Sequence, residues 1–334
     1  HFYGIKCLDY IDGVFSFCIY DLAKKKLFLA RDRFGIKPLY YSLNNKRMIF
    51  SSTMKSLIKE SKKIINKIAL NYHFSLHSVV PAPHTIFDDI FKLEQGHYLE
   101  INRNGKAINK KYYSTKEIKI NRDLDENDII NETERLLIQS IKKRLITSDV
   151  PVGVLLSGGL DSSLIVAISS VHVNSNINTY SIGFSDKDQE QGNEFYYSDM
   201  VVNKYQTNHA KISITDRDLF KSLYDVINIM PEPLSGQDAA GFFLLAKTVS
   251  QSQKVVLSGQ GADELFGGYF WYQQISDNNL NCIDSFMDKY VDRTFINYKT
   301  IVNKKYIDKD YTKDLMNDWY DSYHNEDMSF LDTI

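Results

Sequence analysis

Two glycine-rich segments of the chain carry residue types suited to binding phosphate groups. The first, SGGLDSS, spans 157–163 and follows the mostly apolar run 150–156; the second, SGQGADELFGGY, spans 258–269 and follows the run 254–257. A strand that ends in a glycine-rich turn and continues into a helix presents free backbone N–H groups to an anion. Two such units in one sheet predict an ATP site at the carboxyl ends of parallel strands.

The side chains of the first segment suit a polyphosphate bound with a divalent cation. Gly158 and Gly159 allow a sharp turn with exposed N–H groups, and Ser157 and Ser162 add hydroxyl donors. Asp161 alone would repel phosphate, so we expect Mg²⁺ between its carboxylate and the phosphate oxygens. The segment lacks the lysine of a GxxxxGK[ST] loop, which favours pyrophosphate as the leaving group. The alternative is a Ser/Gly-rich helix cap in which Asp161 is an N-terminal charge.

The second segment repeats the small-residue turn and adds acids. Ser258, Gly259 and Gly261 come directly after the expected strand, and Asp263 follows two residues later. We expect Asp263 to share the Mg²⁺ with Asp161. The alternative is a polar turn with capping acids.

The spacing of apolar residues predicts two parts of different architecture. Residues 1–113 are β-rich, with expected strands at 13–20, 27–30, 38–41, 48–50 and 96–101 and an expected helix at 64–74. The polar stretch 114–128 is the expected linker, and a helix is expected at 129–146. Strands at 150–156, 178–184, 209–214 and 254–258 then alternate with helices, which predicts an α/β domain with a parallel sheet.

Net charge, the length of apolar runs and cysteine spacing argue against three classes of protein: nucleic-acid binders, membrane-spanning proteins and disulfide-rich proteins. The 334 residues carry a net charge of −2, which gives no electrostatic footprint for nucleic acid. No apolar run approaches the roughly 18 residues of a membrane helix. The three cysteines, Cys7, Cys18 and Cys282, are widely spaced, which favours the cytoplasm over a disulfide framework. We expect Cys7 and Cys18 to be apolar packing residues.

Several segments resemble a known family. SGGLDSS resembles the pyrophosphate loop of ATP-pyrophosphatases, and SGQGADELFGGY narrows the resemblance to asparagine synthetases; YSIGF at 180–184 fits as well. DGVFSFCIYD at 12–21 and RDRFGIKPLYY at 31–41 resemble the later half of that family's glutaminase domain. The resemblance implies a partial N-terminal-nucleophile (αββα) glutaminase domain over 1–118. It implies a truncated adenine-nucleotide α-hydrolase-like synthetase domain over 119–334.

The activity implied by the resemblance is that of a ligase. Aspartate, ATP and glutamine (or ammonia) would give asparagine, AMP, pyrophosphate and glutamate through an acyl-adenylate, with Mg²⁺ as cofactor and a homodimer as the assembly. Position 1 is His where the family has its nucleophilic cysteine, so we expect the chain as given to lack glutaminase activity. The KxD segment with the family's catalytic lysine is not found before Ile334, so we expect a chain truncated at both ends.

The resemblance also implies residue roles. Leu156 and Ile182 would flank the adenine, with Gly183 allowing close approach. Ser258 and Gly259 would contact the ribose. The expected ATP-binding set is Leu156, Ser157, Gly158, Gly159, Asp161, Ser162, Ile182, Gly183, Ser258 and Gly259, the expected metal ligands are Asp161 and Asp263, and the expected catalytic residues are Gln260, Asp161 and Asp263.

Gln260 leaves the acceptor carboxylate open. Many asparagine synthetases have glutamate at this position, and a glutamine cannot act as a base or a charge. SGQGADE followed by Tyr269 and the pair Trp271-Tyr272 is similar to N-acetylglutaminylglutamine amide synthetases. The alternatives to aspartate amidation are therefore amidation of such a capped dipeptide and nucleotide binding without catalysis.

Overall fold

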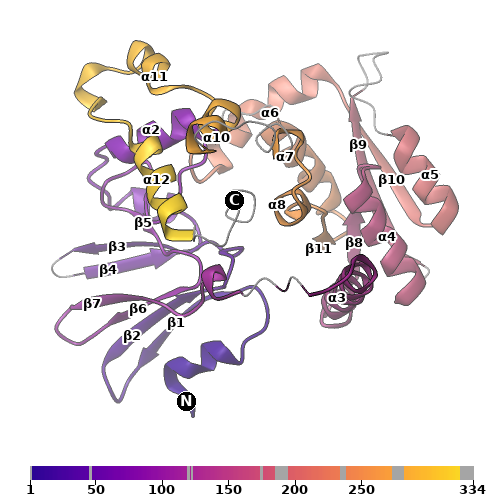
Figure 1. Ribbon diagram of the computed structural model, residues 1–334, viewed down its shortest axis with the longest axis horizontal. Coiled ribbons are helices and arrows are strands. Elements are labelled where there is room, and N and C mark those ends of the chain that lie inside the picture. Colours follow the sequence, from indigo (N-terminus) through magenta and orange to yellow (C-terminus); the bar gives the residue numbers. More distant parts are fainter. Residues whose placement is uncertain are drawn as a thin grey trace. The chain divides into compact units, whose positions relative to one another are not determined.

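The computed structural model describes residues 2–44, 47–118, 121, 123–173, 176–184, 195–233, 238–272 and 282–323. The chain divides into two compact units (Figure 1): His1–Ile120 with Met230–Ser235 and Gln273–Ile334, and Asn121–Ile229 with Gly236–Tyr272. The first division falls beside the expected boundary at 118/119, whereas 230–235 and 273–334 group with the first unit. A synthetase domain over the whole of 119–334 stays a prediction.

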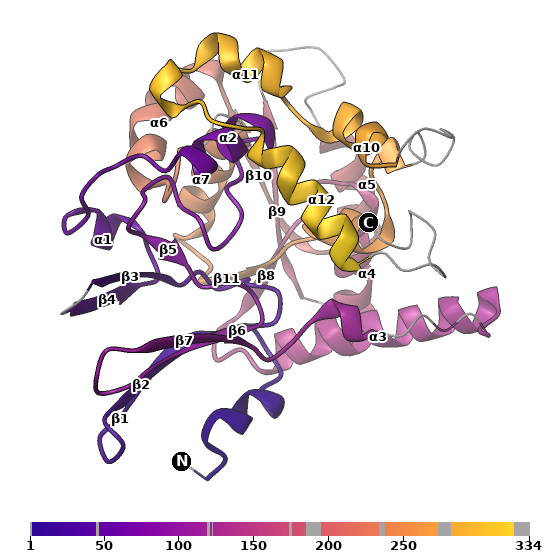
Figure 2. The same ribbon diagram turned by 60° about the vertical axis from the view of Figure 1, so that its left-hand side comes forward.

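Two antiparallel sheets form the β-rich part of the first unit, with strand orders β1-β2-β6-β7 and β4-β3-β5 (Figure 2). Their strands are β1 (Ser16–Asp21), β2 (Lys26–Arg31), β3 (Tyr40–Asn44), β4 (Arg47–Ser51), β5 (Phe91–Lys92), β6 (His97–Ile101) and β7 (Ala107–Lys111). Leu29 and Leu99 of the first sheet share one apolar cluster with Leu39 and Leu93 beside the second. The alternation of side chains therefore gives the two sheets a common core. The predicted β-rich character of 1–113 is confirmed.

Helices complete the first unit. The 3₁₀ helix η1 (Gly4–Asp9), which the sequence did not predict, packs Leu8 against the first sheet; α1 (Lys55–Ile58) packs Leu57 beside the second. Cys7 and Cys18 pack against these apolar clusters, as predicted. The expected helix at 64–74 is α2 (Lys67–Ser75), and the remaining helices are η2 (Thr115–Glu117), α10 (Cys282–Tyr290), α11 (Phe295–Ile301), η3 (Lys304–Tyr306) and α12 (Tyr311–Tyr323).

The C-terminal helices pack on α2. Asn71 Oδ1 accepts hydrogen bonds from the backbone N–H and the hydroxyl of Thr312, at 3.0 and 3.2 Å, and all these atoms are buried. The views in Figures 1 and 2 both show α12 alongside α2. A segment more than two hundred residues away in the sequence therefore completes the core around α2.

A parallel sheet forms the centre of the second unit, with strand order β10-β9-β8-β11. Its strands are β8 (Val152–Leu155), β9 (Asn178–Phe184), β10 (Asn208–Ile214) and β11 (Val255–Leu257), and its helices are α3 (Glu126–Ile146), α4 (Leu160–His172), α5 (Phe195–Tyr205), α6 (Asp216–Ile229), α7 (Asp238–Val249) and α8 (Ala262–Phe266). The predicted α/β class with a parallel sheet is confirmed.

Apolar clusters lie on both faces of this sheet. Val154 of β8 packs with Val166 of α4 and with Val201 of α5, whereas Tyr180 of β9 packs with Leu245 of α7 on the opposite face. The unit therefore has three layers, with helices on either side of the sheet. Because β8 and β11 are parallel neighbours, their carboxyl ends lie at the same edge of the sheet.

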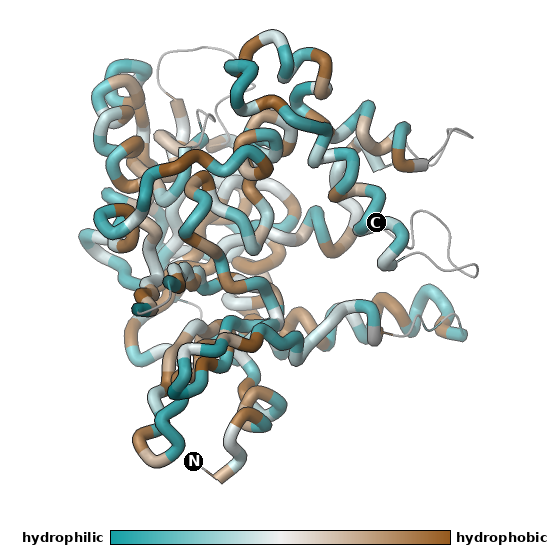
Figure 3. The backbone as a smooth tube through the Cα atoms, turned by 90° about the vertical axis from the view of Figure 1, so that its left-hand side faces the viewer, coloured by the Kyte–Doolittle hydropathy of each residue, from teal (hydrophilic) through white to brown (hydrophobic). Residues whose placement is uncertain are grey.

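Within the described residues, no helix is both long enough and apolar enough to cross a membrane; Figure 3 shows hydrophilic and hydrophobic positions mixed along the helices.

Candidate functional site

The loop between β8 and α4 has the shape that the sequence predicted. Gly158 has a φ of +93°, and a Cβ at this position would lie 2.6 Å from Tyr197 Cβ and 2.7 Å from Ser198 N. Glycine is therefore required for two reasons, because other residues rarely adopt this φ and because α5 leaves no room for a side chain. The turn ends at Gly159, the N-cap of α4.

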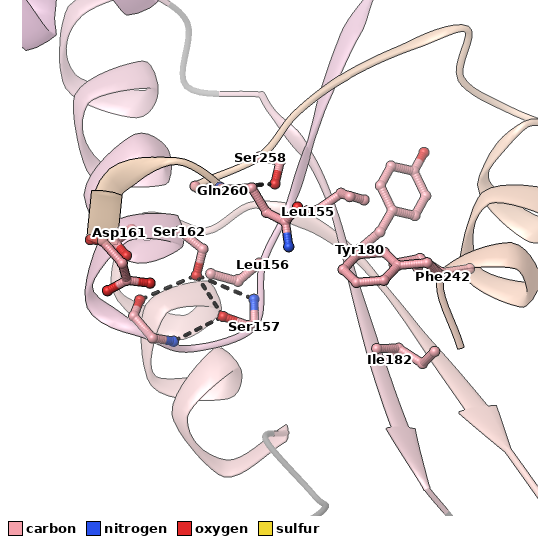
Figure 4. A pocket seen from close by; sticks show the side chains of 14 residues that line it. Leu155, Leu156, Ser157, Asp161, Ser162, Tyr180, Ile182, Phe242, Ser258 and Gln260 are labelled. Carbon is pink, nitrogen blue, oxygen red and sulfur yellow. Dashed lines mark hydrogen bonds between the residues drawn. The ribbon is translucent and has the colours of Figure 1, made fainter. Parts of the chain in front are cut away.

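Hydrogen bonds between serines fix this loop. Ser162 Oγ accepts from Ser157 N at 3.2 Å, lies 3.1 Å from Ser157 Oγ and donates to the Gly159 carbonyl at 3.2 Å (Figure 4). Ser157 Oγ in turn accepts from Gly159 N at 3.2 Å. The buried Ser162 therefore holds the turn at the start of a thirteen-residue helix, whose N-terminus favours an anion.

The second loop joins β11 to the short helix α8. Gly261 at the N-cap has a φ of +97°, and Gln260 N donates to Ser258 Oγ at 3.2 Å. Since β8 and β11 are neighbouring parallel strands, their loops lie side by side. A Cβ at Gly259 would lie 2.8 Å from Asp161 Cβ, so the second loop rests directly on the first turn of α4.

A cavity of about 340 Å³ lies over these two loops. Its lining includes all of the predicted site residues except Gly158 and Gly183; the set is Leu156, Ser157, Gly159, Asp161, Ser162, Ile182, Ser258, Gly259, Gln260 and Asp263. Gly183 is not in the lining; a Cβ at this position would point toward the ring of Phe195, 2.6 Å away. The structure therefore brings together residues that the sequence separates by about one hundred positions.

Four apolar residues outside the expected set of site residues complete the cavity: Leu155, Tyr180, Phe242 and Leu245. The Tyr180 hydroxyl lies 3.0 Å from Ser252 Oγ, while the half-exposed ring of Phe242 stands beside Tyr180 and Ile182 (Figure 4). Phe242 and Leu245 are three positions apart on α7, a spacing that marks one face of a helix but is equally typical of a core. The cavity thus has an apolar wall opposite its polar loops (Figure 4).

Two carboxylates face this cavity. Asp161 and Asp263 are both half-buried lining residues, and neither has an ion-pair partner in the part of the chain that the structure describes. A Cβ at Gly268 would lie 2.2 Å from Asp263 Oδ1, so this glycine leaves the room in which the carboxylate is seated. Mg²⁺ is commonly held by one or two carboxylates together with phosphate oxygens and waters. The pair fits that donor set, although no cluster of three or more metal-ligating side chains is found among the described residues.

The segment after α8 is tied back to the helix. The Tyr269 hydroxyl donates to Glu264 Oε1 at 2.8 Å, and this bond to a carboxylate raises the pKa of Tyr269 to about 12. The rings of Tyr269 and Trp271 stack with centroids 5.6 Å apart. The bond from Tyr269 to Glu264 joins this aromatic segment to the short helix that carries Asp263.

Comparison with known proteins agrees with this architecture. The Asparagine synthase family model matches residues 132–327, and the Glutamine amidotransferase domain model matches residues 1–113. A putative asparagine synthetase [glutamine-hydrolyzing] 2 of Methanocaldococcus jannaschii is 36% identical over 273 residues, covering 80% of this chain and 51% of that protein. Asparagine synthetases [glutamine-hydrolyzing] 3 and 1 of Bacillus subtilis are 30% and 33% identical, covering 80% and 78% of this chain and 45% and 40% of those proteins.

The chain thus spans about half the length of the curated relatives it matches. The Asparagine synthase model alone matches more than half of the chain, including both glycine-rich loops and the cavity that they line. The chain belongs to the asparagine synthase family.

Proposed function

We propose that the protein uses ATP to activate a carboxylate as an acyl-adenylate and transfers ammonia to it. Aspartate is the proposed acceptor, asparagine the product, and glutamine or free ammonia the nitrogen source. The observation that carries the proposal is the pair of glycine-rich loops, from neighbouring strands β8 and β11, that line one cavity with two carboxylates. Membership of the asparagine synthase family supports the choice of reaction.

The reaction has two steps, each with its own leaving group. A carboxylate oxygen attacks the α-phosphorus of ATP, and pyrophosphate leaves; ammonia then attacks the acyl carbon, and AMP leaves with the electron pair of the broken C–O bond. The free N–H groups at the start of α4 and the Ser157 hydroxyl would hold the departing pyrophosphate. Ser258 and Gly259 would contact the ribose, while Leu156 and Ile182 would flank the adenine against the apolar wall.

Asp161 and Asp263 are the proposed ligands of Mg²⁺. The ion would offset the negative charge of the polyphosphate, which the two carboxylates by themselves would repel. This assignment is supported by their shared position in the cavity lining and by the half-buried setting of both carboxylates.

Gln260 favours a second candidate acceptor. Its side chain belongs to the cavity lining, and a neutral amide can donate to an acceptor's amide carbonyl as readily as it accepts. A capped dipeptide such as N-acetylglutaminylglutamine is therefore the alternative substrate. Nucleotide binding without catalysis is the third reading.

One assay separates these readings. The purified protein is incubated with ATP, Mg²⁺ and ammonium, and AMP and pyrophosphate are measured with aspartate, with N-acetylglutaminylglutamine and without acceptor. Release with aspartate supports asparagine formation, release only with the capped dipeptide supports the second candidate, and ATP binding without release supports the third.

Asp161→Asn tests the site itself. We expect this variant to bind ATP–Mg²⁺ weakly and to lose pyrophosphate release while remaining folded. Asp128→Asn is the matched control, because Asp128 is also an acid in the first turn of a helix, α3, but lies outside the cavity. Near-normal pyrophosphate release by a folded Asp161→Asn protein would contradict the proposal.

We further propose a homodimer in the cytoplasm. The family resemblance supports the dimer, and the free thiols of Cys7 and Cys18 together with the use of ATP support the compartment. Sedimentation velocity of the purified protein tests the dimer.

A further inference from the structure

A second cavity, of about 240 Å³, lies within the first unit and shares no residue with the proposed ATP site. Its walls come from the loop after β2, the residues just before and at the start of β6, the end of β7, the segment 113–115 and the end of α12. Cavities for drug-sized ligands are about 300 Å³ or more, so this one suits a smaller molecule. The proposed function assigns it no role.

One wall of this cavity holds an exposed guanidinium that lies over an aromatic ring. Arg33 Cζ lies 5.1 Å from the centroid of the Tyr113 ring, and the ring of Phe34 meets Tyr113 at 5.8 Å in an edge contact. In the described part of the chain, Arg33 has no hydrogen-bond or ion-pair acceptor, whereas Arg31 donates to three backbone carbonyls. Stacking on an aromatic face orients the guanidinium while leaving its N–H donors available for a bidentate carboxylate.

A second cation and one acid share the cavity with Arg33. Lys111 also lines it, and its ammonium has no acid partner among the described residues. Glu94 is the one carboxylate in the lining. Its Oε2 accepts from Asn109 Nδ2 at 2.9 Å and lies 3.9 Å from His97 Nε2, which leaves Oε1 for a further donor.

The end of α12 also contributes to the cavity lining, through Tyr323. Thr115 Oγ1 donates to the Tyr323 hydroxyl at 3.2 Å, and Lys116 Nζ lies 4.9 Å from the centroid of the Tyr323 ring. The lining therefore comes from several segments and includes groups of both charges.

We propose that this cavity binds a free α-amino acid. The ligand's α-carboxylate would pair with Arg33 and Lys111, and its α-ammonium would donate to Glu94. A simple anion such as phosphate would be attracted by the two cations but repelled by the glutamate, whereas a zwitterion satisfies both signs of charge within a small volume.

The test is calorimetric titration of the purified protein with L-asparagine, L-aspartate and L-glutamine, and with inorganic phosphate as the simple anion. Hydrogen exchange of peptides covering 94–115 reports where the ligand binds. We expect saturable binding of at least one amino acid at about 10 mM or below, with protection of these peptides. Arg33→Gln should weaken binding by about tenfold or more, because a charge-assisted bidentate contact is lost.

Matched variants make the result specific. Lys110→Gln, one position from Lys111 and facing the other side of β7, should leave binding within twofold. Glu94→Gln should weaken the binding of the amino acid but not the binding of phosphate. Asp161→Asn should leave this binding unchanged, which separates the outcome from the ATP site.

Three results would overturn the assignment. The first is that none of the three amino acids shows saturable binding or protects these peptides. The second is that Arg33→Gln binds the amino acid as tightly as the parent protein does. The third is that phosphate binds more tightly than any amino acid and that Glu94→Gln strengthens phosphate binding further. The last would identify a simple anion site.

Discussion

The two loops of the proposed ATP site lie in close contact at Gly259, and alanine at this position is a sharp test of the site. An added Cβ would lie 2.8 Å from Asp161 Cβ and 3.1 Å from Ser162 N. Gly259 does not lie in the left-handed region of φ, so alanine adds no backbone strain there. The substitution therefore acts through steric overlap between the loops alone.

The overlap sets the size of the effect. Non-bonded carbons pack at about 3.5 Å or more, so the new methyl group overlaps Asp161 Cβ by about 0.7 Å. Neither neighbouring atom can rotate away, since one is a Cβ and the other a backbone nitrogen of the same helical turn. Overpacking of this kind costs about 1–3 kcal/mol. If the loops move apart to relieve it, the dissociation constant for ATP–Mg²⁺ should rise by about 5- to 150-fold.

The assay is calorimetric titration of Gly259→Ala with ATP–Mg²⁺, with urea unfolding to confirm that the variant is folded. Gly13→Ala is the neutral control, because a Cβ added at Gly13 would have no atom within 4 Å and its φ lies outside the left-handed region. Gly261→Ala, which has open space but a φ of +97°, reports the effect of backbone strain without overlap. A folded Gly259→Ala protein that binds ATP–Mg²⁺ within twofold of the parent would refute the reasoning.

Three further predictions concern the apolar wall, the first unit and pH. Phe242→Ala removes a half-exposed ring from the cavity wall, so ATP affinity should fall by about tenfold, measured by the same titration, with little change in unfolding midpoint. Glu232→Gln removes the acid partner of Lys92, whose Nζ keeps the Val80 carbonyl as an acceptor. Because both side chains are at most 14% exposed, the free energy of unfolding measured in urea should fall by about 3 kcal/mol. Burial lowers the pKa of the His209 ring below 6.5 in the folded protein, so the unfolded state takes up the proton first as the pH falls. The neutral ring therefore contributes its full stability above pH 6.5, and this stability is lost as the pH falls through the folded pKa. Urea unfolding between pH 7.5 and 5 should show this loss, and His209→Asn should reduce its slope.

The local elements of the second unit follow closely from the sequence. The expected strands at 178–184 and 209–214 are β9 and β10 to within one residue, and β8 and β11 lie inside the expected ranges. β8 and β11 are apolar runs bounded by polar residues, whereas β9 and β10 carry apolar residues at alternate positions, so local preference and tertiary environment agree. The prediction of a parallel sheet followed from the alternation of such runs with helices.

Long-range packing in the first unit had no such signal. The contact of Asn71 with Thr312 joins positions 241 apart, and neither helix carries a local pattern that names its partner. The half-buried ion pair of Lys92 with Glu232 likewise joins the segment 230–233 to the first unit. Periodicity shows which face of an element is apolar, but it does not identify the element that covers it.

The same limit applies to the site. Ser157, Asp161 and Ser258 belong to motifs whose glycines and acids have few other uses, so their shared cavity could be anticipated. Phe242 and Leu245 could not, because an apolar pair at helical spacing is ordinary in any core. Gly183 was expected to make room for a base, but its missing side chain makes room for Phe195.

The charges in the cavity limit how ATP can be held. Among the described residues, the lining contains two carboxylates and no lysine, arginine or histidine. A polyphosphate brought to Asp161 and Asp263 therefore needs positive charge that the lining side chains do not supply. The N-terminus of α4 offers about half an elementary charge, which cannot offset two carboxylates and the phosphates together. A divalent cation would cancel the charge of the two carboxylates and bridge them to phosphate oxygens. It would then draw both loops onto the same phosphates, which would link the close contact at Gly259 to the binding of nucleotide.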